Sequence, residues 1–459
     1  MAKLVYDKNG RLEFTKEMRR EYTILAPNMA PIHFNMLETV LRSHGYRAVL
    51  LKNTGPAVVE CGLKYVHNDT CYPALLTIGQ MIDALNSGQY DPKRTALLMT
   101  QTGGGCRASN YIHLLRKALQ KAGYGDVPVI SVNTAGLEKN SGFKLTLPLI
   151  RQAMAALVYG DLMMLLSNQV KPYETQKGQA MELVNQWSKR LTRQFEQRSG
   201  YSKAQIARNL QRIAYDFSQI PVNMTPKVKV GIVGEIYVKY SPLGNNNLEA
   251  LLRREDCEVM LPGILNFVMY CVDDLVEDAA LYGGGQIKAA AARQALKYLC
   301  DIERSLIQAV TQYPQFHAPS PFSRVKELTQ GVIGLGCKMG EGWLLTAEMA
   351  ELIEAGYGNI VCAQPFGCLP NHIAGKGVIR RLRELYPDSN IVPVDYDPGA
   401  TSVNQENRIK LMLAVARENL QKSSSSQPVL SPAPAQPSQA PKTDCGSLSR
   451  SQAASGANG

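Results

Sequence analysis

The sequence predicts an α/β protein in which two parallel-sheet domains are joined by a helical connector and followed by a disordered C-terminal tail. Short apolar segments alternate with helical segments in both halves, which is typical of parallel sheets covered on both faces. The tail is reduced to Ser, Pro, Ala, Gln and Gly, a composition that cannot bury a core. The predicted parts are an arm at 1–20, a first α/β domain at 21–146, the connector at 147–222, a second α/β domain at 223–421 and the tail at 422–459.

The first domain contains four predicted strands, at 22–26, 46–51, 95–100 and 127–132. A helix is expected at 32–44 and another at 109–122. A third helix should run through Leu75, Ile78, Met81, Ile82 and Leu85, because these residues recur at helical spacing after Pro73. Strands and helices therefore alternate throughout this half.

The second domain repeats the alternation. Strands are predicted at 228–238, 257–261, 358–361 and 390–394. Helices are predicted at 247–255, 279–313, 341–355 and 376–385, with a last helix that runs through Arg417. The two halves share no short sequence repeat, although they have the same kind of pattern.

Composition limits the function classes. The chain has 459 residues, 45% hydrophobic, and a formal net charge of +11. No run of eighteen apolar residues and no apolar signal core occurs, so we expect a cytoplasmic protein without a membrane span. The ten cysteines then indicate buried thiols, catalysis or metal binding rather than disulfides. The basic residues are scattered and no aromatic-rich motif accompanies them, so no nucleic-acid partner is expected.

Two cysteines lie close together in the segment VCAQPFGCLPNHIAGKG (361–377). Cys362 and Cys368 flank Pro365 and Gly367, and Pro370 follows at once. Proline removes a backbone donor and glycine permits unusual dihedrals, so we expect a loop here rather than a helix. Two thiols after a buried strand would occupy the position at which open α/β sheets bind ligands.

Three further cysteines have a similar context. Cys71 lies just before Pro73, Cys106 follows a triple glycine, and Cys337 ends the segment GLGC, each ahead of a predicted helix. Helix N-termini present unpaired N–H groups and the positive end of a dipole, which stabilise thiolates and anionic iron–sulfur clusters. These five loop cysteines therefore favour an iron–sulfur cluster as the cofactor.

Other interpretations of the cysteines remain open. Cys257, Cys271 and Cys300 lie in apolar strand or helix patterns and are expected to be buried hydrophobic residues. Cys61 is ambiguous, and Cys445 lies in the tail. Zinc is the main inorganic competitor, but the tight Cys-x2-Cys knuckles of structural zinc sites are absent. A catalytic-thiol enzyme would need only one of the five loop cysteines.

Candidate polar residues are fewer. His372, Lys376 and His67 flank the cysteine loops, and each could donate a proton or bind phosphate. His372 is the candidate catalytic residue, although an ordinary loop position explains it equally well. No GxxxxGK[ST] motif occurs, so this chain is not expected to hydrolyse nucleotides.

Four segments resemble the 2-hydroxyacyl-CoA dehydratase and benzoyl-CoA reductase superfamily. They are KYVHNDTCYPALLTIGQ (64–80), TQTGGGCRASNYIHLLRKAL (100–119), GCKMGEGWLLTAEM (336–349) and CAQPFGCLPNHIAGKG (362–377). The likeness is closer still to the dehydratase-like part of the large CoA-substrate-specific enzyme activase proteins and to the double-cubane cluster proteins. It extends over about residues 20–420.

The resemblance implies two Rossmann-like domains around a cysteine-bound cluster, and it also implies partners. An ATP-hydrolysing iron–sulfur activator would supply a low-potential electron, the substrate would be an acyl-CoA, and the oligomeric state could be a dimer. Three cysteines hold one [4Fe–4S] cluster in the dehydratases, and six hold an [8Fe–9S] double cubane in the double-cubane proteins. Cys71, Cys106, Cys337, Cys362 and Cys368 match, which leaves Cys61 or Cys271 as the sixth ligand of a double cubane.

The function expected from these observations is low-potential reduction, or radical dehydration of a 2-hydroxyacyl-CoA type of substrate, dependent on the activator. Two alternatives belong to other classes. One is a non-catalytic iron–sulfur electron-transfer subunit. The other is a zinc-stabilised binding protein.

Overall fold

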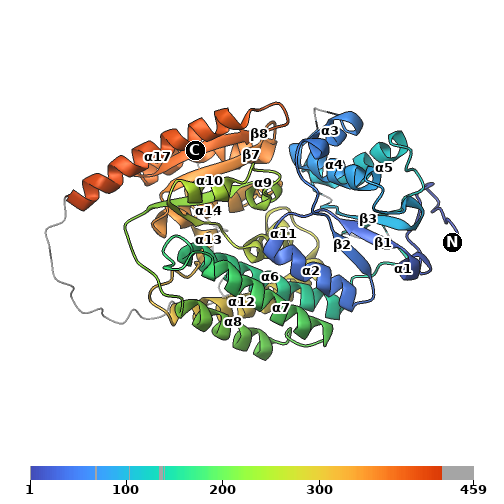
Figure 1. The fold of residues 1–459 in the computed structure, drawn as a ribbon, viewed down its shortest axis with the longest axis horizontal. Coiled ribbons are helices and arrows are strands. Elements are labelled where there is room, and N and C mark those ends of the chain that lie inside the picture. The colour runs from blue at the N-terminus through green and yellow to red at the C-terminus, as the bar shows by residue number, and fades with distance from the viewer. Residues whose placement is uncertain (1, 68–69, 103, 134–137, 139, 426–459) are drawn as a thin grey trace.

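The computed structural model describes residues 2–67, 70–102, 104–133, 138 and 140–425. Two four-stranded parallel sheets lie among helices, which confirms the predicted fold class (Figure 1). The predicted tail falls beyond residue 425, outside the described residues, except that the last helix α17 (Ser402–Ser425) extends into it from the predicted boundary at 422.

The first sheet has the strand order β2-β1-β3-β4. Its strands are β1 (Thr23–Ala26), β2 (Arg47–Leu50), β3 (Thr95–Thr100) and β4 (Val129–Val132). The sequence order reverses between β1 and β3, so the loops after these two strands diverge and leave a crevice at the carboxyl ends. The accompanying helices are α1 (Met18–Glu21), α2 (Pro31–Ser43), α3 (Pro56–Tyr65), α4 (Tyr72–Asn86) and α5 (Tyr111–Lys121).

The second sheet has the equivalent order β6-β5-β7-β8. Its strands are β5 (Val228–Gly234), β6 (Cys257–Met260), β7 (Asn359–Pro365) and β8 (Asn390–Tyr396). The corresponding reversal of order lies between β5 and β7. Its helices include α9 (Ile236–Tyr240), α10 (Leu248–Arg254), α13 (Phe322–Glu327), α14 (Gly342–Glu354), α15 (Leu369–Ala374) and α16 (Ile379–Leu385).

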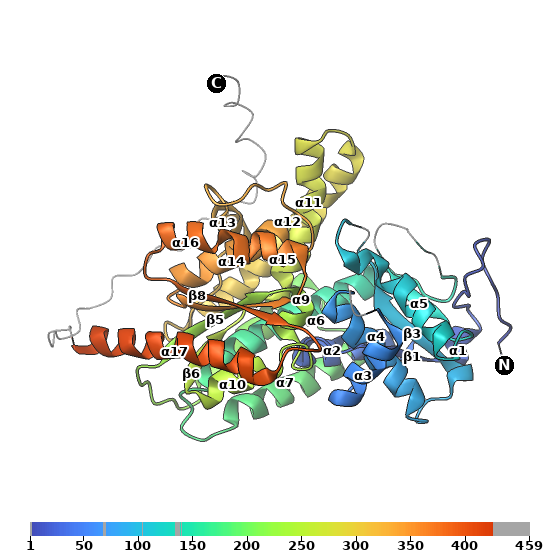
Figure 2. The same cartoon turned by 90° about the horizontal axis from the view of Figure 1, so that it is seen from above.

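A layer of long helices packs against both sheets. Helices α6 (Leu147–Val170), α7 (Gln179–Glu196) and α8 (Lys203–Ser218) occupy the predicted connector. They pack together with α11 (Ile264–Leu281) and α12 (Gln286–Thr311), whose hairpin projects from the body in Figure 2. Helix α6 is long and apolar enough to cross a bilayer by composition, but most of it is buried by its neighbours in this layer.

Three local predictions are wrong. The strand predicted to reach residue 238 ends at Gly234, whose φ is 143°, and α9 begins because the Glu235 carboxylate accepts a hydrogen bond from Val238 N at 2.8 Å. Helix α11 begins at Ile264, fifteen residues before the predicted start at 279, because Asp161 of α6 caps its first turn.

The cysteine segment also differs from the predicted loop. Strand β7 continues through Cys362 to Pro365, and the residues after Cys368 form the short helix α15. Pro370 does not prevent this helix, because it lies in the first turn, where no backbone donor is needed.

Candidate functional site

Three of the predicted site cysteines lie at helix N-termini, as expected for Cys71 and Cys106 but not for Cys368, which was predicted to lie in a loop. Cys71 is the N-cap of α4, Cys106 is the N-cap of the 3-10 helix Arg107–Asn110, and Cys368 is the N-cap of α15. The unpaired N–H groups of these first turns therefore lie beside the thiols. Two of these helices follow a loop at the carboxyl end of a strand, β3 or β7.

The position of Cys71 depends on close packing of α3 against α4. An added Cβ at Gly62 would lie 2.5 Å from Leu75, and one at Gly79 would lie 2.2 Å from the carbonyl oxygen of Val58. Only glycine allows the two helices to approach this closely. The Cys71 thiol, at the start of α4, is hydrogen-bonded by the side chain of Tyr111 from α5.

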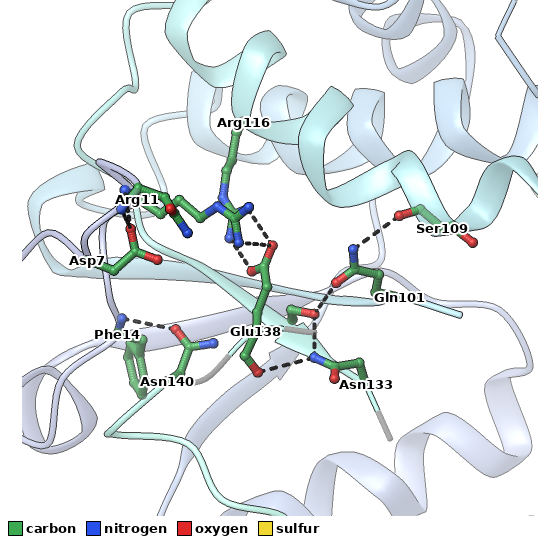
Figure 3. A network of polar contacts seen from close by, with 11 residues as sticks. Asp7, Arg11, Phe14, Gln101, Ser109, Arg116, Asn133, Glu138 and Asn140 are labelled. Carbon is green, nitrogen blue, oxygen red and sulfur yellow. Dashed lines mark hydrogen bonds and ion pairs between the residues drawn. The ribbon is translucent and has the colours of Figure 1, made fainter. Parts of the chain in front are cut away.

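The loop that carries Cys106 is fixed by polar contacts at the end of the first sheet. Ser109 Oγ donates to the Gly104 carbonyl oxygen at 2.6 Å, and Gln101 Nε2 donates to the Ser109 carbonyl oxygen at 3.2 Å. Ser131 Oγ on β4 donates to Gln101 Oε1 at 2.8 Å. Figure 3 shows this chain of contacts from β4 to the start of the 3-10 helix.

The same network binds the N-terminal arm. The Glu138 carboxylate accepts from Arg116 Nη2 at 2.6 Å and from Arg11 Nη1 at 3.3 Å, and Phe14 N donates to Asn140 Oδ1 at 3.2 Å (Figure 3). Burial by itself would raise the pKa of the Glu138 carboxyl group. The hydrogen bond and the positive charge of Arg116 outweigh burial, so this pKa is lowered. The arm thus contacts Glu138 and Asn140, which follow β4.

The cysteine loops of the two sheets touch each other. An added Cβ at Gly105 would lie 2.5 Å from Met339 Sδ, and one at Gly340 would lie 3.2 Å from Pro370 and 4.0 Å from Cys106 Sγ. The loop before α14 is therefore wedged between the Cys106 loop and the start of α15. Segments that are more than 200 residues apart in sequence meet here.

Glu341 lies at the centre of this junction. It is buried, its Oε1 accepts from Ile236 N at 2.9 Å, and its Oε2 accepts from Asn371 Nδ2 at 2.8 Å. Asn371 Nδ2 is also 3.5 Å from Cys368 Sγ. Glu341 thereby connects the end of β5 to the helix that starts at Cys368.

The charge of Glu341 acts on five of the cysteine thiols. Burial is the main reason that the pKa of each of these thiols is raised, and the negative charge of Glu341 raises each pKa further. These thiols are Cys71, Cys106, Cys271, Cys362 and Cys368. Cys337, whose pKa is also raised by burial, precedes Glu341 by four residues, and its carbonyl oxygen accepts from Trp343 N at 2.7 Å.

Glu235 is the second buried carboxyl group near the thiols, at the start of α9. Its charge contributes to the raised pKa of Cys71, Cys106 and Cys368. Burial, and next the charge of Glu341, raise the pKa of Glu235 itself. Sequence reasoning missed both carboxyl groups. The available signal was the position of Glu235 after the apolar run VGIVG, at the carboxyl end of a strand beside the point where strand order reverses.

Cys362 is the most enclosed of the predicted site residues. It lies inside β7, paired in register with Val233, and is 0% exposed. Its Sγ is 3.0 Å from the position that a Cβ on Gly375 would take. Burial raises the pKa of Cys362 to about 12. Its thiol therefore lies behind the loops that carry the other cysteines and not on an open loop.

The two candidates for a sixth cysteine have different surroundings. Cys271 lies on α11 with an exposed side chain, and the surrounding protein, then the charges of Asp274 and Glu341, raise its pKa. The expectation that it is a buried hydrophobic residue is wrong. Cys61 lies on α3 and contacts Asn86 Nδ2 at 3.8 Å. Its pKa is affected by Asp83 and Lys64 but by none of the site residues.

Two further cysteines of the described residues, Cys257 and Cys300, lie apart from this group. Cys257 and Cys300 are buried, as expected from their apolar patterns. Cys445 lies outside the described residues. The structure therefore separates Cys61, Cys257 and Cys300 from the thiols around Glu341.

His372 follows Cys368 by one turn of α15. Its Nδ1 donates to the Cys368 carbonyl oxygen at 2.8 Å, since a carbonyl can only accept, and its Nε2 lies 3.6 Å from Asp395 Oδ1. The ring therefore bridges α15 and the end of β8. His372 remains a candidate for proton transfer, although these contacts also suit a positioning role.

The cysteine and carboxyl side chains of the site could in principle bind a single metal ion or an iron–sulfur cluster. Among the described residues, no three His, Cys, Asp or Glu side chains converge closely enough to bind one ion, as a structural zinc site requires. An iron–sulfur cluster is several atoms across, so its thiolate ligands stand around it rather than meeting at a point. Asn371 Oδ1 is buried without a hydrogen-bond partner beside Cys368, which leaves a polar group for an additional occupant. The described residues therefore offer no ready ligand set for a single ion.

Comparison with known proteins adds no assignment. The chain matches no protein-family model and no curated protein sequence.

Proposed function

We propose that this chain is an iron–sulfur protein that carries out low-potential reduction or dehydration of a small substrate, similar to the 2-hydroxyacyl-CoA dehydratases. One observation carries the proposal: the loop of Glu341 brings cysteines from both sheets together. Cys337 lies on this loop, Asn371 Nδ2 joins Glu341 to Cys368 Sγ, and a Cβ at Gly340 would lie 4.0 Å from Cys106 Sγ. The Glu341 charge also acts on the thiols of Cys71, Cys271 and Cys362, which makes six candidate ligands. Separate buried cysteines would have no reason to share one neighbourhood.

The surroundings of Cys271 favour it over Cys61 as the sixth ligand. Six thiolates match the ligand number of an [8Fe–9S] double cubane, whereas a single open [4Fe–4S] cluster would need three. The group, once bound, would supply electrons of low potential. Because thiols must lose their protons to bind iron, cluster assembly would release these protons and would overcome the raised pKa values.

Backbone N–H groups and carboxyl groups of the protein would stabilise the bound cluster and supply protons. The first turns that follow Cys71, Cys106 and Cys368 have backbone N–H groups that could hydrogen-bond to the sulfur atoms of a bound cluster. Burial, and next the charge of Glu341, raise the pKa of Glu235 to about 8, so this carboxyl group can hold a proton near neutral pH. A protonated Glu235 carries no charge next to an anionic group and is a candidate proton source, together with His372.

The proposed partner is an ATP-hydrolysing iron–sulfur activator, and the proposed substrate class is an acyl-CoA. Both rest on the sequence resemblance of the four cysteine segments. An electron-transfer subunit without a substrate is the alternative. Anaerobic assays with activator, ATP and a 2-hydroxyacyl-CoA would separate the two, because only the enzyme consumes substrate.

The first experiment measures iron, acid-labile sulfide and zinc per chain after anaerobic purification and reconstitution. About eight irons per chain are expected for a double cubane and about four for a single cluster. Zinc without sulfide would contradict the proposal and favour a zinc-stabilised binding protein.

A pair of matched variants tests the ligand set. Cys271→Ser should lower the iron content and change the EPR spectrum of the reduced protein, whereas Cys61→Ser should leave both unchanged. Equal iron content in the two variants, with about four irons in each, would contradict the six-thiol arrangement and retain only a smaller cluster.

A further inference from the structure

A pocket of about 470 Å³ lies at the edge of the first sheet opposite to the thiols. Its lining comes from α1 and the arm just before it, from the α2–β2 turn and the start of β2, and from the loop that precedes α6. The lining residues are Lys16, Arg19, Arg20, Gly45, Arg47, Ser141 and Lys144. Arg47 is the first residue of β2, so the pocket lies at the amino ends of the strands, whereas the thiol loops lie at the carboxyl ends. Figure 1 shows α1 beside the β1 and β2 strands.

The pocket is lined by five cationic side chains and no acidic one. Within the described part of the chain, none of the five forms an ion pair with a carboxylate. Glu17 and Glu21 lie on or next to α1 but do not line the pocket, and Glu21 contributes only its carbonyl oxygen, to Arg47 Nη1 at 3.3 Å. Like charges that converge without a counter-charge are unfavourable unless an anion joins them.

Several of these cations are held in place before any ligand binds. Arg19 Nη2 donates to the His44 carbonyl oxygen at 2.6 Å, and its guanidinium lies 4.4 Å from the centre of the Tyr46 ring. The Tyr46 hydroxyl accepts from Lys144 N at 3.0 Å, and its ring packs on Phe143. The buried Tyr46 therefore fixes the Arg19 guanidinium and the backbone of Lys144, and a preorganised donor such as Arg19 loses little entropy on binding.

The loop on the other side is equally constrained. Gly142 N donates to the Phe14 carbonyl oxygen at 2.8 Å, and an added Cβ at Gly142 would lie 2.1 Å from the Thr15 carbonyl oxygen. This contact holds Ser141 and Lys144 beside Lys16. The pocket is thus a formed feature of the fold rather than a chance group of surface lysines.

We propose that this pocket binds a small ligand that carries at least two phosphate groups. Its volume lies within the range of small-molecule sites. Arginine dominates the lining and suits bidentate hydrogen bonding to phosphate oxygens. The lining offers no exposed aromatic ring for a base, because Tyr46 lies beneath Arg19. Recognition therefore rests on the phosphates, whether they belong to pyrophosphate or to a nucleoside diphosphate, and this site is independent of the thiol site.

The test is calorimetric titration of the full chain with inorganic pyrophosphate, orthophosphate and ADP. Pyrophosphate should bind saturably at low salt, at least tenfold more tightly than orthophosphate, and high salt should weaken it. ADP with an affinity similar to that of pyrophosphate would support recognition of the phosphates alone. ADP binding tenfold tighter would overturn it, because the nucleoside would then contribute.

Matched variants locate the site. Arg20→Gln with Lys144→Gln should weaken pyrophosphate at least tenfold, whereas Arg208→Gln with Arg212→Gln on α8, which removes the same charge elsewhere, should not. Arg20→Lys with Lys144→Arg should retain binding. Equal losses in the two double variants, or no pyrophosphate binding to the unmodified chain, would overturn the proposal. A twenty-nucleotide single strand that binds more tightly than pyrophosphate and depends on the same residues would also overturn it, in favour of a nucleic-acid surface.

Discussion

Asp161 should be a major determinant of stability, because its carboxylate joins three helices in the interior. Oδ1 accepts from His33 Nε2 at 2.9 Å and from Ile264 N at 2.7 Å, while Oδ2 accepts from Leu265 N at 2.8 Å. His33 is 1% exposed and Asp161 5% exposed. These contacts join α2 to α6 and cap the first turn of α11, which carries Cys271.

Asp161→Asn keeps the volume but replaces one acceptor oxygen with a donor that faces another donor. One or two hydrogen bonds to a charged acceptor, worth about 1.5–3 kcal/mol each, are lost, so we expect a cost of about 2–5 kcal/mol. That is a large part of the usual stability of about 5–15 kcal/mol. Guanidinium denaturation followed by circular dichroism and by tryptophan fluorescence measures it.

Asp126→Asn is the matched control, since Asp126 is exposed on the loop before β4. It should change the free energy of unfolding by less than about 0.5 kcal/mol. His33→Gln combined with Asp161→Asn should cost less than the sum of the two single changes, because both remove the same contact. An Asp161→Asn variant as stable as the control would refute the role assigned to this carboxylate.

Three other changes probe the core by the same denaturation assay. Lys239→Met leaves the buried Glu348 without the ammonium group 2.9 Å away, so about 3–5 kcal/mol should be lost, and Glu348→Leu in the same chain should recover most of it. Gly79→Ala places a Cβ 2.2 Å from the Val58 carbonyl oxygen and should cost about 1–3 kcal/mol; an unchanged midpoint would contradict the close approach of α3 and α4. Burial raises the pKa of Glu303 from 4.5 to about 8, so its contribution is full below about pH 4.5 and is lost as the pH rises through about 8. Relative to Glu303→Gln, the unmodified chain should therefore lose up to about 1.4 kcal/mol of its free energy of unfolding per pH unit between about pH 4.5 and 8. Plots of the free energy of unfolding against pH that run parallel for the two proteins would contradict this.

Much of the fold could be predicted because its signals are local. The eight strands were found near their observed positions since each is a short apolar run bounded by turn residues. Proline at the start of α4 marked a helix that begins immediately after Cys71. The errors arose where distant groups decide the structure. Helix α11 starts early because Asp161, more than 100 residues away in sequence, satisfies its first N–H groups.

The site could be predicted only in part, for a related reason. Glycine and proline next to Cys71 and Cys106 indicated helix starts, and these cysteines are indeed N-caps, whereas the same signals around Cys368 predicted a loop and missed α15. The proline and glycine after Cys362 predicted a loop at this cysteine. In the structure, strand β7 continues past it to Pro365. Glu341 looked like an ordinary helix residue, and its central position follows from the contact of three loops that sequence spacing does not reveal.

The arrangement of strands explains why these three loops meet. Both sheets have the same strand order, and in each the reversal of order opens a crevice at the carboxyl ends. The Cys106 loop leaves the first crevice, and Glu235 and Cys368 follow the two strands that border the second. Contact of Met339 with Gly105 places the loop before α14 against the Cys106 loop. Helix α11 adds Cys271, so the thiols affected by Glu341 come from both sheets and from the helical layer. A cluster bound to these thiols would link the three parts, and its removal should loosen the contact between the two sheets before it unfolds either one.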